Sequence, residues 1–461
     1  MTATNDIPEL AGICSYREAG TIGYSVDENV RRLLRFQWAE LSIARILVAH
    51  LPATPEWEVK CGLALHQWEC TTHADALRAR IAEMRSPVPP LDKAPDEPLA
   101  AFFEELKRSS GTVELVADVY GVALPALWAA YRTHLDDTNH LVDHPTERLL
   151  RTAIPETESA IAWGDRCMAA LVQDDPKAGA LAEHWREHLV AYLLGARGIA
   201  GASEPRASKP GELPPPRAAE PFRPDMHPRR DGRFGGAYNF NFPPHVVYNA
   251  EGVPDDERNL ALLCKRTLEM DVPEMMASFM TERADLPWDL RVDYSRQLWD
   301  EARHAMMGTV ALQARGVNWK SLPLNVGFAL RLNLHATPLE RQIILYGIEQ
   351  SLMPAEVGKR SEYETARASG DELSAHFHDY DWADEVLHAR IGRRAMKHEG
   401  ITREEALERA QQIHDKTWAA LDSYRERDPQ ADWWADFVRR VLGHDSAVRD
   451  RNLGDPKVLT E

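Results

Sequence analysis

The sequence predicts an all-α protein in which two helical halves flank a proline-rich stretch. Apolar residues recur at spacings of three and four, with charged residues between them, over most of the 461 residues. Strand patterns are sparse, and the one β-like patch, FNFPPHVVYN, is interrupted by two prolines. Residues 201–245 hold ten of the 30 prolines, and this stretch separates two halves of similar length.

The helices expected in chain order are long and amphipathic, and they cover 27–50, 57–85, 257–282, 289–315, 337–360 and 381–398. Proline fixes the backbone φ angle and lacks an amide donor. The stretch 201–245 is therefore predicted to be an extended linker or an arm that lies on a surface. The expected domains are a helical domain at 1–200, the linker or arm at 201–250, and a second helical domain at 251–461.

The composition excludes several classes of protein. Hydrophobic residues make up 44% of the chain, which is enough for a large core and excludes a disordered chain. The formal net charge of −18 argues against a nucleic-acid or membrane partner, because either would need a basic face. The five cysteines form no CxxC motif, and no signal-peptide pattern or apolar run near 18 residues is present. The expected location is the cytoplasm.

The two halves of the sequence resemble each other. The segments PEWEVKCGLALHQWECTTHA (55–74) and LPWDLRVDYSRQLWDEARHA (286–305) align without a gap, as do PTERLLRTAIPE (145–156) and PLERQIILYGIE (338–349). The matched pairs are Trp57 with Trp288, Trp68 with Trp299, His73 with His304, and Glu156 with Glu349. Two ungapped matches in the same order indicate a duplicated helical unit. Chance similarity between amphipathic helices is the alternative.

The second half contains two copies of the motif DExxH. The first places Glu301 and His304 three residues apart, and the second does the same for Glu385 and His388. Residues i and i+3 share one face of a helix, so each pair can bind one metal ion together. In each copy the aspartate before the glutamate is positioned to accept a hydrogen bond from the ring N–H of a histidine on another helix, and this bond would orient the ring. These aspartates are Asp300 and Asp384.

A site of this design needs one more carboxylate from each of two other helices. Glu269 lies 32 residues before Glu301, and Glu349 lies 36 residues before Glu385, separations that fit a helix, a short turn and half of the next helix. Glu274 is an alternative to Glu269, since Pro273 between them can kink that helix. Carboxylate-rich ligation with only two imidazoles suits iron or manganese rather than zinc.

These motifs resemble the ferritin-like di-iron carboxylate superfamily. The segments LPWDLRVDYSRQLWDEARHA and DEVLHARIG are similar to a bacterial ferritin-like family, and the resemblance covers residues 255–400. It implies a ferritin-like four-helix bundle that binds two iron ions per chain, or manganese in one position. By this resemblance Glu301 and Glu385 bridge the ions, Glu269 with His304 completes one position, and Glu349 with His388 completes the other. Asp300 and Asp384 would support the imidazoles.

Three further residues are candidates near this site. Tyr346 lies three residues before Glu349 on the same face, where either a redox role or plain packing is consistent with its position. His376 and His378 precede the expected last helix and are either additional ligands or surface residues.

In the first half the corresponding ligand positions are mostly lost. Cys70 replaces Glu301, Trp38 replaces Glu269, and His188 and Ala191 fall opposite Glu385 and His388, so only His73 and Glu156 survive. We therefore expect a degenerate copy that serves as a packing partner. The alternative is a different metal site made from other side chains of this half: Glu40, Glu69, His73, Glu156, His184 and His188.

The function expected from this ligand set is an O₂-dependent oxygenase or oxidase that acts on a small organic substrate. Two Fe(II) ions held close together can jointly deliver electrons to O₂, which would be the co-substrate. No cysteine pattern for an iron–sulfur centre is present, so an external electron donor or the substrate would supply electrons. The alternatives are a ferroxidase that handles iron and a scaffold stapled by metal. A homodimer is compatible with the sequence.

Overall fold

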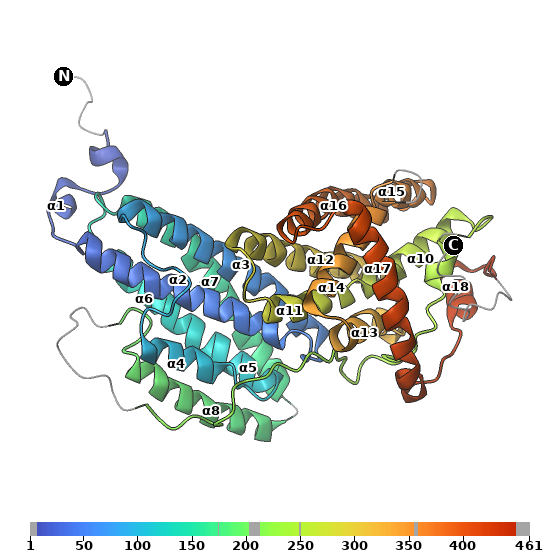
Figure 1. Cartoon of the computed structure of the whole chain (residues 1–461), viewed down its shortest axis with the longest axis horizontal. Helices are drawn as coiled ribbons and strands as arrows, with labels where there is room; N and C mark the ends of the chain where they lie inside the picture. The colour runs from blue at the N-terminus through green and yellow to red at the C-terminus, as the bar shows by residue number, and fades with distance from the viewer. Residues whose placement is uncertain (1–6, 174, 202–212, 249, 355–357, 449–461) are drawn as a thin grey trace. The chain divides into compact units, whose positions relative to one another are not determined.

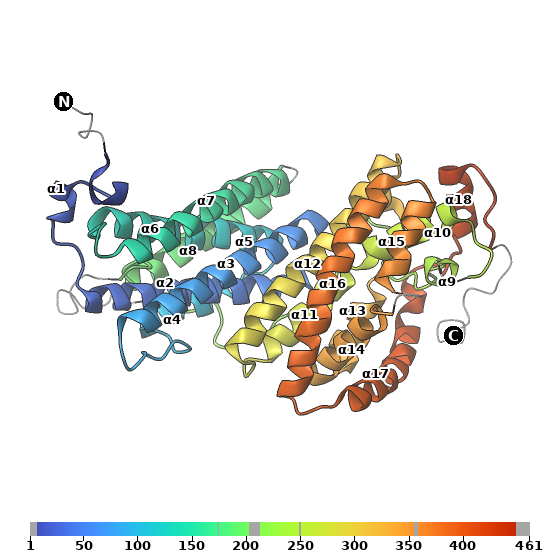
Figure 2. The same cartoon turned by 90° about the horizontal axis from the view of Figure 1, so that it is seen from above.

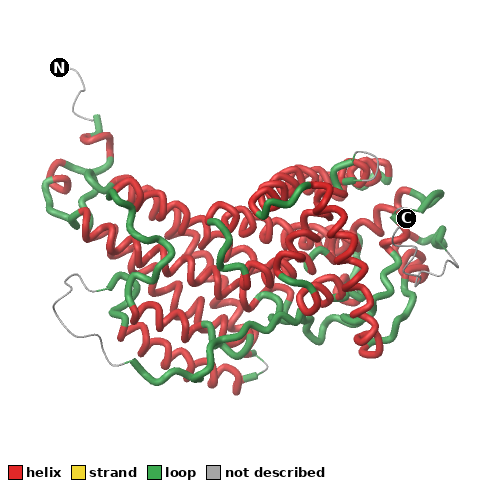
Figure 3. Tube along the Cα trace, viewed as in Figure 1, coloured by secondary structure: helices red, strands yellow, loops and turns green. Residues whose placement is uncertain are grey.

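The computed structural model describes residues 7–173, 175–201, 213–248, 250–354 and 358–448, and in these ranges it contains helices but no strand (Figures 1 and 3). The expected all-α class is confirmed. The chain divides into two compact units, one formed by Met1–Leu47 with His66–Arg223 and the other by Val48–Leu65 with Pro224–Glu461.

The first unit is built mainly from long helices. They are α1 (Tyr16–Ala19), α2 (Val26–His50), α3 (Trp57–Met84), α4 (Glu97–Leu106), α5 (Thr112–Asp118), α6 (Leu124–Asp137), α7 (His144–Val172) and α8 (Pro176–Gly195), and α2 and α3 continue into the second unit. Inside this unit α6 packs on α7, and α4 and α5 pack on α8 (Figure 1). The helical stretch Thr112–Asp137, which includes a π-helical turn at Val119–Ala123, is long and apolar enough to span a membrane. The apolar window of this stretch is 61% buried inside the structure, and the stretch qualifies by length and composition only.

The second unit contains the helices that surround a buried polar cluster. Its helices are α9 (Pro244–Val247), α10 (Asp255–Leu268), α11 (Asp271–Glu282), α12 (Trp288–Ala314), α13 (Gly327–His335), α14 (Pro338–Ser351), α15 (Lys359–Ala368), α16 (Glu372–His398), α17 (Arg403–Trp418) and α18 (Trp434–Leu442). Helix α12 packs on α10 and α16, and α16 packs also on α14 and α15 (Figure 2). These contacts bring together the faces that carry the candidate metal ligands.

Two helices predicted to be continuous are interrupted. The expected helix 257–282 is divided into α10 and α11, with the break at Glu269 and Met270. The ring of Pro273 would clash with the carbonyl four residues earlier, which belongs to Glu269, so α10 ends just before that residue.

The expected helix 337–360 ends at Ser351, because Pro354 disfavours helical backbone at the residue before it. A separate helix, α15, begins at Lys359.

One predicted helix is longer than expected. The segment 381–398 is the second part of α16, which begins at Glu372. Asp371 caps this helix, since its side chain accepts a hydrogen bond from the backbone N–H of Ser374. His376 and His378 therefore lie inside α16 and not in a loop before it, and helices α17 and α18 follow.

The described part of the proline-rich stretch is irregular, as expected, except for the single helical turn of α9. That turn has prolines at its start, where their fixed φ angle fits a helix and no amide donor is needed. Arg230 ties the stretch to α11: its guanidinium lies 2.9 Å from Asp271 Oδ1 and 2.6 Å from Glu274 Oε1, and all three side chains are buried. Lys60 also pairs with Glu274. The arm is thereby fixed to the helix that follows Glu269.

Candidate metal centre

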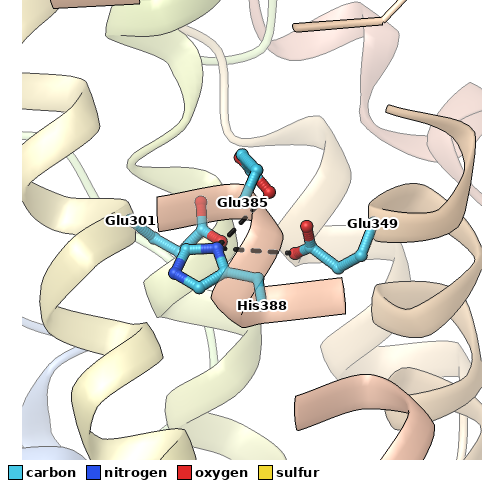
Figure 4. Close-up of side chains that lie close together, drawn as sticks. All are labelled: Glu301, Glu349, Glu385 and His388. Carbon is cyan, nitrogen blue, oxygen red and sulfur yellow. Dashed lines mark ion pairs between the residues drawn. The ribbon is translucent and has the colours of Figure 1, made fainter. Parts of the chain in front are cut away.

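The six predicted ligands come from four helical segments and meet inside the second unit. Helix α12 carries Glu301 and His304, α16 carries Glu385 and His388, and α14 carries Glu349. Glu269 directly follows α10 as its C-cap residue. Five of them are buried and Glu269 is half-buried. Figure 4 shows Glu301, Glu349, Glu385 and His388 with their polar ends directed toward one another.

The first cluster of ligand atoms lies around His388. Its Nδ1 is 3.2 Å from Glu301 Oε1, 3.4 Å from Glu385 Oε2 and 4.0 Å from Glu349 Oε1. One ligand atom from each of these four residues lies within 4.8 Å of all the others. Gln297 donates a hydrogen bond of 2.9 Å to Glu349 Oε1 and so orients that carboxylate.

The second cluster lies around His304. Its Nδ1 is 3.2 Å from Asp381 Oδ1, 3.8 Å from Glu301 Oε2 and 4.0 Å from Glu385 Oε1. Glu269, His304 and Asp381 again offer ligand atoms within 4.8 Å of one another. Glu301 and Glu385 each turn one oxygen toward His388 and the other toward His304. This is the arrangement that a carboxylate needs to bridge two metal ions.

The outer nitrogen of each imidazole faces an aspartate of the opposite helix. His388 Nε2 lies 3.4 Å from Asp300 Oδ2, and His304 Nε2 lies 3.1 Å from Asp384 Oδ2. Arg303 links the two aspartates at 2.6 Å from each. Although burial favours the neutral acid, hydrogen bonds from His388 and the arginines hold the pKa of Asp300 far below its ordinary value. Anionic aspartates of this kind keep the hydrogen on the outer nitrogen and direct Nδ1 to the carboxylates.

The donor atoms that face inward fit a metal ion. Among the described residues, several buried side-chain atoms in the two clusters make no hydrogen bond, and they are His388 Nδ1, Glu349 Oε2, Glu385 Oε2, His304 Nδ1 and Asp381 Oδ2. A buried polar atom without a partner costs about 1–3 kcal/mol. One divalent cation in each cluster would bind the atoms of that cluster, and histidine and carboxylate are ordinary ligands of such ions.

The pKa values of three ligand groups, two imidazoles and one carboxyl, are raised by their surroundings. Burial opposes a charge on His304, but the carboxylates around it, Asp381 first, raise its pKa to about 9. The pKa of His388 is raised as well, because Asp300, Glu301 and Glu385 outweigh burial. Burial and the adjacent Glu385 raise the pKa of the Glu349 carboxyl. Metal binding is therefore expected to release protons.

Three residues that the sequence analysis did not name belong to this site. Asp381 lies one helical turn before Glu385, so the i, i+4 spacing on α16 is a signal that could have found it. Lys359 enters from α15, with its Nζ 2.8 Å from Glu385 Oε1, 3.0 Å from Asp381 Oδ1 and 3.7 Å from Glu269 Oε1. Arg266 pairs with Asp381 and lies 2.8 Å from Glu269. Arg266 lies three residues before Glu269, so local spacing places it beside that ligand. Lys359 begins a separate helix, and local spacing does not predict its contacts with Glu385 and Asp381.

The remaining candidates fall outside the two clusters. Glu274, the alternative to Glu269, lies in the separate buried group with Arg230 and Lys60. Tyr346 is buried, and its ring contacts Gly392 of α16, which agrees with packing. His376 is exposed. His378 is buried beside Arg266, and with Glu362 and Asp381 it forms a third group whose ligand atoms lie within 4.8 Å of one another and could hold a metal ion.

In the first unit the surviving pair, His73 and Glu156, belongs to a buried ion-pair group. His73 Nδ1 lies 3.0 Å from Glu40 Oε1, and its Nε2 lies 2.7 Å from Glu156 Oε2. Tyr131 donates a hydrogen bond of 2.6 Å to Glu40. Burial, together with Glu156, raises the pKa of nearby Glu69 to about 7. Both nitrogens of His73 form hydrogen bonds with carboxylates, whereas Nδ1 of His304 and of His388 in the second unit makes no hydrogen bond.

The other two residues of the alternative set lie elsewhere. The side chain of His184 is 87% exposed, and its nearest acidic partner is Glu187. His188 Nε2 lies 3.0 Å from Glu105. The six residues of the alternative first-unit site are therefore not brought together.

Comparison with known proteins adds no relative. No family model matches the chain, and neither a curated protein nor a solved structure is found to match it. The interpretation of the site thus depends on its own residues and geometry.

Asp300→Asn is expected to weaken binding of the metal ion at His388 by about 10- to 100-fold, since the outer nitrogen of this imidazole would lose its anionic acceptor. Calorimetric titration with Mn(II), which avoids oxidation, measures the change. Asp379→Asn is the matched control, because Asp379 lies exposed on α16. Equal affinities for the wild type and Asp300→Asn would contradict the orienting role.

Proposed function

We propose that the chain is a metal-dependent oxidoreductase that uses O₂ to oxidise a small organic substrate. The observation that carries this proposal is the placement of Glu301 and Glu385, each of which has one oxygen toward each of two buried imidazoles. Iron is the proposed ion, two per chain at full loading, because oxygen-rich ligation with two imidazoles suits iron or manganese.

The proposal includes a ferritin-like four-helix bundle. Its four members would be α10 with α11, α12, α14 and α16, because α12 and α16 carry the ExxH pairs and the other two segments each contribute one glutamate. We further propose that the first half of the sequence, residues 1–200, is a degenerate duplicate of the second. In support, α3 begins at Trp57 and α12 begins at Trp288, the two residues that the sequence alignment pairs.

Iron(II) ions bound at this centre would supply electrons to O₂. The chain's own residues hold the ligands in place: Asp300 and Asp384 orient the imidazoles, and Gln297 orients Glu349. Burial of the donor atoms keeps bulk water away from the reacting centre. The proposed partners are the organic substrate and an external electron donor, and the proposed location is the cytoplasm.

Anaerobic loading with Fe(II), followed by rapid mixing with O₂, tests this function. We expect two irons per chain, O₂ consumption, and a transient visible absorption whose lifetime changes when a substrate is added. Uptake of many more irons per chain as a ferric product would instead indicate iron handling. Bound metal that never reacts with O₂ would indicate a scaffold. Each of these two results would overturn the proposal.

A further inference from the structure

Lys359 is a buried ammonium group placed among metal-ligand oxygens. Its side chain has no measurable exposure, and its Nζ lies 2.8 Å from Glu385 Oε1 and 3.0 Å from Asp381 Oδ1. Glu269 Oε1 is 3.7 Å away. These are oxygens of the second cluster, the one that also contains His304 Nδ1.

The first cluster has a different electrostatic environment. Glu349 and Glu385 Oε2 form ion pairs with His388, and Glu349 Oε1 also accepts a hydrogen bond from the neutral amide of Gln297. Among the described residues, no lysine or arginine forms an ion pair with Glu349, and Glu385 Oε2 makes no hydrogen bond. The two clusters share Glu301 and Glu385, yet in the described part of the chain the Lys359 ammonium lies beside the oxygens of the second cluster.

We propose that the Lys359 ammonium occupies the second metal position, so that the first ion binds tightly at His388 and the second must displace Lys359. This inference depends on the proposed metal centre and deepens it, because it makes the two positions unequal. A cation bound near Glu385 and Asp381 compensates their charge as a metal ion would, and two cations cannot share these oxygens without strong repulsion. The flexible four-carbon stem of lysine allows the ammonium to withdraw.

Titration of the full chain with Mn(II) under anaerobic conditions tests this inference, with free Mn(II) measured by electron paramagnetic resonance. The wild type is expected to bind one ion tightly and a second at least about tenfold more weakly. Lys359→Met is expected to tighten the second ion by at least about tenfold while it leaves the first nearly unchanged. Equal affinities in the wild type, or an unchanged second affinity in Lys359→Met, would overturn the inference.

Lys265→Met is the matched control. Lys265 is also a largely buried lysine, but it pairs with Glu362 and not with a ligand of the two positions. We expect its substitution to leave both affinities unchanged. If Lys265→Met tightened binding of the second ion as much as Lys359→Met does, the inference would be overturned. Any loss of positive charge nearby would then explain the gain in affinity.

A stability measurement covers the case in which Lys359→Met folds poorly. Removal of the ammonium leaves Asp381 and Glu385 less compensated, so saturating Mn(II) should raise the melting temperature of Lys359→Met or Lys359→Gln more than that of the wild type. An equal rise would overturn the inference. A wild type that binds no ion would overturn the metal centre itself, whereas two ions of equal affinity would overturn only the role of Lys359.

Discussion

Glu385→Ala is expected to remove both metal ions from the protein. Glu385 Oε2 lies 3.4 Å from His388 Nδ1 in the first cluster, while its Oε1 lies 4.0 Å from His304 Nδ1 in the second. One substitution therefore deletes an oxygen from each position. Metal content after loading and desalting, measured by plasma mass spectrometry, should fall from two ions per chain to less than one.

Glu156→Ala serves as the control for this loss. Glu156 is the residue of the first unit that the sequence alignment pairs with Glu349, and its side chain is 43% exposed beside His73. We expect this variant to keep both ions, since His73 and Glu156 form an ion pair and not a metal site. An empty Glu156→Ala, or a fully loaded Glu385→Ala, would contradict the assignment of the ligands to the second unit.

His73→Gln is expected to lower the free energy of unfolding of the first unit by about 3–5 kcal/mol near neutral pH. Glu40 is fully buried, and His73 is its positively charged partner at 3.0 Å. Removal of one member of a buried ion pair leaves the other charge uncompensated, which typically costs this amount. Urea unfolding followed by a signal of the first unit measures the difference between the variant and the wild type.

The effect of His73→Gln should depend on pH. Burial disfavours the charged imidazole, but Glu40 and Glu156 outweigh it and raise the pKa of His73 to about 10. A pKa above the unfolded value of about 6.5 means that the stabilisation is complete below pH ~6.5 and is lost as the pH rises through about 10. The difference in stability should therefore shrink between pH 7 and pH 10. If the difference in stability between His73→Gln and the wild type grew with pH, the charged pair would be contradicted. His184→Gln is the control, because the side chain of His184 is exposed and its loss should leave the stability unchanged.

The long helices could be predicted because their apolar periodicity is strong. The expected helix 289–315 is observed as α12, Trp288–Ala314, and 27–50 is observed as α2, Val26–His50. The interruptions were harder to predict. Pro273 indicates a kink in the first of these helices but not the full break at Glu269. The gap after Ser351 depends on Pro354, and the apolar pattern continues across both interruptions.

The candidate site shows the same division between local and tertiary information. Glu301 with His304 and Glu385 with His388 could be found because i, i+3 spacing fixes which side chains share a face. Asp381 was missed because the helix was expected to begin at that residue and not nine residues earlier. Lys359 was missed because it belonged to the expected helix 337–360. Only the separate helix α15 carries it to Glu385.

Anomalous diffraction from crystals loaded anaerobically with Fe(II) tests the central claim most directly. Data collected on both sides of the iron absorption edge should show a strong peak bounded by Glu301, Glu349, Glu385 and His388. At higher Fe(II) a second peak should appear near Glu269, His304 and Asp381, with the Lys359 ammonium moved away. A map without an iron peak among these side chains, from crystals of an iron-loaded protein, would contradict the metal centre.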